Sequence, residues 1–244
     1  MTNTKTTCIR AALTLSLSLG TSAAWAQTAT DAPAPEHARD LGNHQRHLRI
    51  DVGVRTQFVR SKGFDPFASN DVLPQLTLAA SYYFWAHERF SLGAVVGFDY
   101  GARSDSARSG DTSLDSRRFL LAPELRYHVL RVLALSAKVG PTLTRQEVTY
   151  SGGLAGDLAK TAWKAGFDAT AGAAFEVFGY SNPQSNKPRL WLTAEGGYGW
   201  TAANRLRLEP EDSSPAPQRL TPLDLGQLSL SGPLFRVTAA VSFW

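Results

Sequence analysis

The chain has 244 residues, 43% of them hydrophobic and 19% charged, and its formal net charge is +4. This composition is typical of one folded domain and excludes a disordered or fibrous protein. The mean hydropathy is −0.19, and no run approaches the roughly 20 apolar residues that a spanning helix requires, which excludes a bundle of membrane helices. The basic residues form no dense cluster, so we expect no nucleic-acid partner.

The first 26 residues have the three parts of a secretory signal peptide. Lys5 and Arg10 supply positive charge, residues 11–20 form a short apolar core, and Ala24-Trp25-Ala26 is a small-residue cleavage site. The core is too short for an uncleaved membrane anchor, the alternative interpretation. We therefore expect the mature chain to begin at Gln27, with a flexible tail over residues 27–44.

Cleavage would change the charge and the thiol content of the chain. Loss of Lys5 and Arg10 lowers the net charge from +4 to +2. Cys8, the only cysteine, lies inside the predicted signal peptide. The mature chain is then expected to hold neither a disulfide nor a cysteine metal site, and the sequence predicts no metal site and no cofactor.

From His47 onward, polar and apolar side chains alternate with a period of two, which predicts strands with one apolar and one polar face. The first such segment covers residues 47–58. Apolar rows continue over residues 76–84, 90–100, 119–127, 133–143, 163–177, 190–200 and 235–243. We count about eight strands, the smallest number typical of bacterial outer-membrane barrels.

The predicted connections between these strands alternate in length. Long connections are expected at residues 61–74, 104–115, 146–161 and 202 to about 231, and short or moderate ones at 85–89, 129–132 and 179–188. Long outer loops and short periplasmic turns are typical of a membrane barrel. Residues 45–244 are therefore predicted to form an all-β, closed, antiparallel, up-and-down transmembrane β-barrel.

Aromatic residues gather at the ends of the predicted strands, while Leu, Val and Ala fill the middles. Two aromatic belts around an aliphatic band match the two interfaces of a membrane. One belt is predicted near the short turns, with Tyr82, Phe84, Trp85, Phe90, Tyr127, Phe178, Tyr180 and Trp191, and with Phe243 and Trp244 at the terminus. The other is predicted near the long loops, with Phe58, Tyr100, Phe119, Trp163, Tyr198 and Trp200.

The polar face of the strands carries both signs of charge beside small residues, which suits a narrow interior. An eight-stranded barrel has room inside only for side chains, so these charges are predicted to form a network of ion pairs that plugs the lumen. The predicted members are Arg49, Asp51, Arg55, Asp99, Arg118, Glu124, Arg126, Lys138, Lys164, Asp168, Glu176, Glu195 and Arg236. The alternative is a narrow gated path for ions.

The chain ends with an alternating strand, residues 235–244, whose last residues are Phe243 and Trp244. This strand resembles the C-terminal assembly signal of outer-membrane proteins, with the usual terminal Phe one place earlier. In strand pattern, residues 45–244 resemble the small outer-membrane barrel superfamily that includes the transmembrane domain of outer membrane protein A. The resemblance implies an outer-membrane location and recognition by the barrel assembly machinery.

The sequence favours a structural or surface-interaction barrel whose long loops face outward, because loops on a rigid scaffold often carry binding function. Expected partners are outer-membrane lipid, lipopolysaccharide and an extracellular ligand of the loops. The alternatives are a small pore or transporter for ions or small apolar molecules and, more distantly, a soluble lipid-binding barrel. No enzymatic activity is predicted, because none of the five histidines lies near the outer leaflet or forms a His-x-Ser pair along a strand.

Overall fold

The computed structural model describes residues 48–87, 89–107, 110–151, 157–178, 188–210 and 223–243. The predicted signal peptide, the predicted tail, Tyr180 and Trp244 lie outside the described residues. One short 3₁₀ helix, η3 (Lys62–Phe64), lies between β1 and β2. Within the described ranges, no helix is long and apolar enough to cross a membrane.

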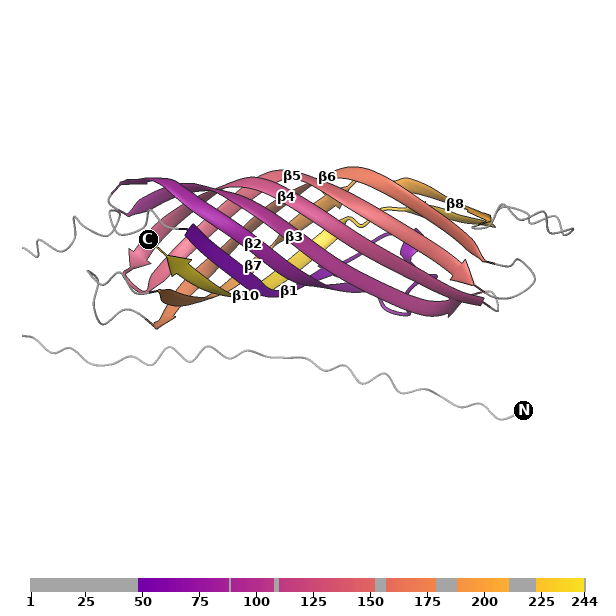
Figure 1. Cartoon of the computed structure of the whole chain (residues 1–244), viewed down its shortest axis with the longest axis horizontal. Helices are drawn as coiled ribbons and strands as arrows, with labels where there is room; N and C mark the ends of the chain where they lie inside the picture. Colours follow the sequence, from indigo (N-terminus) through magenta and orange to yellow (C-terminus); the bar gives the residue numbers. More distant parts are fainter. Residues whose placement is uncertain are drawn as a thin grey trace, which may run out of the picture. The chain divides into compact units, whose positions relative to one another are not determined.

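Eight antiparallel strands close into a ring in which each strand pairs with its neighbours (Figure 1). The first strand of the ring pairs with the last, from Leu48 opposite Phe243 to Gln57 opposite Leu234. This closure confirms the predicted up-and-down barrel. The ring strands are β1 (Leu48–Phe58), β2 (Val72–His87), β3 (Phe90–Ala107), β4 (Gly110–Leu130), β5 (Leu133–Ser151), β6 (Leu158–Phe178), β7 (Arg189–Thr201) and β10 (Gly232–Phe243).

Three of the predicted long loops contain more strand than the sequence suggested. β3 and β4 remain paired as far as Ala107 and Gly110, and β5 and β6 as far as Tyr150 and Leu158. The prediction of loops at 104–115 and 146–161 was wrong because the alternation continues there with its faces exchanged. Leu114 and Val148 face inward, while Asp115 and Glu147 face outward. The last predicted loop holds a hairpin of β8 (Asn204–Pro210) and β9 (Leu223–Leu228).

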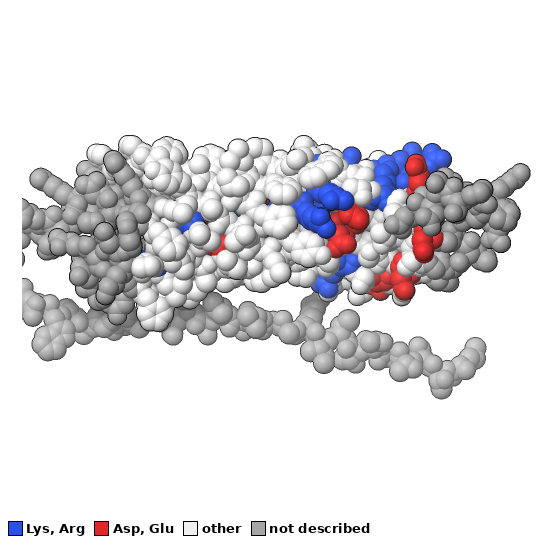
Figure 2. Space-filling model, viewed as in Figure 1, with Lys and Arg blue, Asp and Glu red and all other residues white. Residues whose placement is uncertain are grey.

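The outer surface of the ring is apolar, as predicted. Leu76 is 64% exposed, Val96 61% and Leu121 59%, which is the arrangement expected where the wall faces lipid. Charged side chains show on the visible face mainly towards the end that carries the strand extensions (Figure 2). Trp191 corrects one member of the predicted belt: it is buried inside the ring, where its Nε1 donates to Ser242 Oγ at 3.1 Å.

Small residues on the inner face allow the strands to approach closely. A Cβ atom added to Gly140 would lie 2.1 Å from the carbonyl oxygen of Leu121, and one added to Gly197 would lie 2.1 Å from that of Ala169. No side chain fits at such distances. These glycines therefore permit the tight curvature that an eight-stranded ring requires.

We expect Val96→Arg to lower the free energy of unfolding by roughly 2–4 kcal/mol, the cost of an arginine facing lipid near the middle of the bilayer. The measurement is denaturant unfolding of the barrel in lipid vesicles. Ser104→Arg is the matched control, because Ser104 is exposed on the same strand beyond the apolar band. Equal effects of the two substitutions would contradict the proposed position of the membrane.

Candidate functional site

A continuous chain of ion pairs crosses the lumen. Lys138 Nζ lies 2.6 Å from Glu195 Oε1, and Glu195 Oε2 lies 3.4 Å from Arg236 Nη1. Arg236 Nη2 then lies 3.3 Å from Asp99 Oδ2. These four side chains come from β5, β7, β10 and β3, so the chain joins strands that lie far apart around the ring.

Asp99 connects this half of the ion-pair chain to a second half. Its Oδ2 lies 2.7 Å from Arg55 Nη1, which is also 3.3 Å from Asp168 Oδ2. Asp168 Oδ1 in turn pairs with Arg118, and Thr77 donates a hydrogen bond to Asp99. With β1, β6, β4 and β2 added, every strand of the ring contributes to one connected polar network.

Two further ion pairs lie beside this chain, and each joins residues two apart on one strand. Arg49 Nη2 lies 2.6 Å from Asp51 Oδ1, and Arg126 Nε lies 2.7 Å from Glu124 Oε1. The Arg126 guanidinium also stacks over the ring of Tyr83, with its carbon 4.6 Å from the ring centroid. Tyr83 was not among the predicted lumen residues, which were charged or small, although the alternation with Tyr82 and Phe84 places it inside.

The remaining predicted charges behave differently. Glu176 is buried, and its Oε2 lies 3.7 Å from Nη1 of Arg189, a partner that the sequence analysis did not predict. Lys164 has no carboxylate within ion-pair distance among the described residues, which corrects its assignment to the network. The reason is its position: Lys164 is half-buried opposite Thr144, and the next residue in this cross-strand row is Arg118, so no carboxylate stands beside it on β5 or β4.

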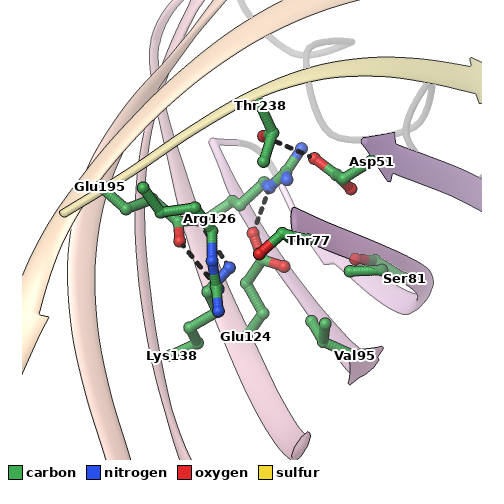
Figure 3. Close-up of a pocket in the computed structure, with 11 residues that line it drawn as sticks. Asp51, Thr77, Ser81, Val95, Glu124, Arg126, Lys138, Glu195 and Thr238 are labelled. Carbon is green, nitrogen blue, oxygen red and sulfur yellow. Dashed lines mark hydrogen bonds and ion pairs between the residues drawn. The ribbon is translucent and has the colours of Figure 1, made fainter. Parts of the chain in front are cut away.

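The ion pairs leave little space in the lumen. Asp51, Glu124, Arg126, Lys138 and Glu195 point towards one small cavity (Figure 3). Its volume of about 10 Å³ is enough for one water molecule. The side chains that line this cavity therefore leave it about the size of one water molecule.

A serine and a histidine meet across two strands inside the barrel. Ser91 Oγ lies 3.4 Å from His128 Nε2. Both residues are fully buried, so a substrate carbonyl has no direct route to this pair. A His-x-Ser pattern along one strand does not reveal this contact, because Ser91 lies on β3 and His128 on β4.

The end of the barrel at which β4, β5 and β6 extend beyond the apolar band contains an apolar core, here called the apolar cap. It is built from the connection between β1 and β2, the extensions of β4, β5 and β6, and the β8–β9 hairpin. Its buried members, each at most 5% exposed, are Val59, Phe64, Phe67, Leu73, Leu114, Val148, Tyr150, Leu158, Leu206, Leu208, Leu228 and Leu230. In this cap the strands point apolar side chains into the barrel, whereas along the apolar band they point them outward.

Hydrogen bonds hold the connection between β1 and β2 against β9 of the hairpin and against β4. Ser61 Oγ donates to the carbonyl of Gln227 at 3.0 Å, and Thr112 donates to the carbonyl of Pro66. A Cβ atom added to Gly63 would lie 2.2 Å from the Gln227 oxygen, so this close approach requires glycine. The connection is thus packed into the mouth of the barrel.

The outer side of the hairpin is polar. Arg205 Nη2 lies 2.8 Å from Asp224 Oδ2, and both side chains are well exposed. The backbone N–H of Gly226 and the Arg205 guanidinium hold the pKa of Asp224 below its usual value. Arg207 and Glu209 are also exposed, so the hairpin presents both signs of charge to the solvent.

No family model and no curated protein matches the chain. A comparison with solved structures finds similar folds. The Ail attachment invasion locus protein of Yersinia pestis is 12% identical, with 81% of this chain and 98% of Ail covered and a TM-score of 0.44. Ail in complex with the heparin analogue sucrose octasulfate gives 12% identity, the same coverage and a TM-score of 0.47. The outer membrane protease OmpT of Escherichia coli gives 8% identity, coverage of 81% and 96%, and a TM-score of 0.43.

The outer and inner faces of the barrel wall define the class of this protein. A ring that exposes leucine, valine and aromatic side chains, and buries arginine, aspartate and glutamate, is inverted relative to a water-soluble barrel. The chain is a small transmembrane β-barrel, the architecture typical of bacterial outer membranes.

We expect Asp99→Asn to lower the free energy of unfolding by roughly 3–5 kcal/mol, because it leaves buried arginines without their shared carboxylate. The measurement is urea unfolding of the folded barrel in detergent or vesicles. Asp224→Asn, in the exposed hairpin pair, is the control and should leave the unfolding midpoint nearly unchanged. Similar midpoints for both variants would contradict the central role of Asp99.

Proposed function

We propose that this protein is a closed outer-membrane barrel with a structural or surface-interaction role, rather than a pore or an enzyme. The observation that carries the proposal is the ion-pair chain, to which seven ring strands contribute charged side chains and β2 contributes the Thr77 hydroxyl. The cavity beside it, among the described residues, has a volume of about 10 Å³. The apolar cap adds a second obstruction above it. A hydrated ion would have to break several buried pairs to pass, which is energetically costly.

The binding role is assigned to the extracellular end. There the cap fixes the connections on a packed apolar core, which gives the exposed side chains of the hairpin stable positions. Rigid scaffolds that carry exposed connecting segments commonly bind partners through them. The absence of enzymatic activity is part of the proposal and is supported by the complete burial of the Ser91–His128 pair.

Single-channel recording tests the closed lumen. The purified barrel, shown to be folded by its heat-dependent shift on a gel, should give no discrete conductance steps in a planar bilayer. A variant with Phe64→Ala and Phe67→Ala, which removes two aromatic rings of the cap, should remain silent because the ion-pair chain below is intact. Reproducible steps from the unmodified barrel would make transport its function, and steps from the variant alone would assign the barrier to the cap.

Cysteine labelling on intact cells tests the orientation that the binding role requires. Glu209→Cys should react with a membrane-impermeant maleimide, because Glu209 is exposed on the hairpin. Arg131→Cys, in the exposed turn between β4 and β5 at the opposite end, should react only after the outer membrane is permeabilised. The natural chain has one cysteine, Cys8 in the predicted signal peptide, so the background is low. The opposite labelling pattern would place the hairpin in the periplasm.

A further inference from the structure

Two arginines lie directly opposite each other on the outer wall of the barrel. Arg117 on β4 is the cross-strand neighbour of Arg145 on β5. Tyr100 on β3 flanks the first arginine, and Trp163 on β6 flanks the second. These four side chains form one continuous row around the wall, here called the arginine row.

The arginine row marks the level at which the outer wall changes character. One row towards the membrane lie Phe98, Phe119 and Leu143, and Phe119 stacks on Trp163 with their ring centroids 6.2 Å apart. One row outward lie two carboxylates, Asp115 and Glu147. Because aromatic belts sit at the level of the lipid headgroups, the arginine row lies at that level too.

The charges in this row are only partly neutralised by the protein. Arg145 Nη2 lies 3.1 Å from Glu147 Oε2. Asp115 instead accepts a hydrogen bond from the Tyr100 hydroxyl at 3.1 Å, and Arg117 has no carboxylate within ion-pair distance in the described part of the chain. Like charges directly opposite on neighbouring strands destabilise a sheet, so an anion between the two guanidinium groups would be stabilising.

We propose that the arginine row binds the phosphate of a phosphorylated lipid headgroup in the outer leaflet. Guanidinium groups match phosphate oxygens with paired hydrogen bonds. The adjoining Phe98, Phe119 and Leu143 would contact the acyl chains of the same lipid, which favours a lipid over a free anion. Asp115 and Glu147 would repel phosphate placed further outward and so confine it to the row. This site depends on the membrane position of the wall and does not require a closed lumen.

Retention of lipid A by the purified, folded barrel, measured by native mass spectrometry, tests the proposal. Replacement of both arginines, Arg117→Gln with Arg145→Gln, should weaken retention of bisphosphorylated lipid A about 30-fold, which corresponds to roughly 1 kcal/mol for each interfacial arginine. Arg205→Gln with Arg207→Gln removes the same charge from the hairpin and should change retention little. Arg117→Lys with Arg145→Lys should give an intermediate value, since charge is kept and the paired geometry is lost.

Three other outcomes would contradict the proposed lipid site. Equal losses in the row and hairpin variants would show general attraction to charge rather than a site. Equal retention of dephosphorylated lipid A by the unmodified barrel would show that the acyl chains alone bind. Competition by inorganic phosphate at concentrations similar to those of lipid A would identify a free-anion site. The four substituted residues lie on the outer surface, and the gel shift on heating confirms that each variant is folded before the measurement.

Discussion

The structure depends on the need to neutralise charges that a closed ring of strands buries. In lipid the outer wall must be apolar, so each strand turns its polar residues inward, where an eight-stranded barrel has no room for bulk water. Asp99 meets this constraint most directly, because it accepts contacts from Arg55, Arg236 and Thr77 at once. The ion-pair chain, together with the Thr77 hydrogen bond, therefore links all eight strands, and its contacts depend on their relative register.

In the apolar cap the same strands turn apolar side chains inward and polar side chains outward. On β4, Arg118 faces inward while Phe119 faces lipid, yet four residues earlier Leu114 faces inward and Asp115 outward. The alternation of side chains continues unbroken, and only the solvent outside the wall changes. Above the membrane the barrel is folded like a water-soluble protein, with a core formed by residues from distant parts of the chain. Such a core explains why the strands extend well beyond the apolar band.

The period of two was enough to predict which side chains face inward, because a closed ring fixes the face of every residue once the apolar side is known. Twelve of the thirteen predicted lumen charges take part in ion pairs, and Lys164 has no such partner among the described residues. Which charges pair could not be predicted, since Arg55 and Asp168 meet across the lumen only through the tilt and stagger of the strands. The cap was missed for a related reason: Phe64 and Phe67 follow no strand period, although alternation in Arg205-Leu206-Arg207-Leu208 was a visible sign of the hairpin.

Arginine has two different roles in this barrel, one in the lumen network and one in the arginine row. Inside the barrel, Arg55 and Arg118 are each paired with carboxylates, as an arginine removed from water requires. On the outer wall Arg117 can reach water, so the fold does not require an internal partner for it, and the neighbouring Asp115 is engaged by Tyr100 instead. An arginine placed beside another arginine, at the level of the headgroups, contributes little to holding the strands together. Its position is better explained by a negative charge supplied by the membrane itself.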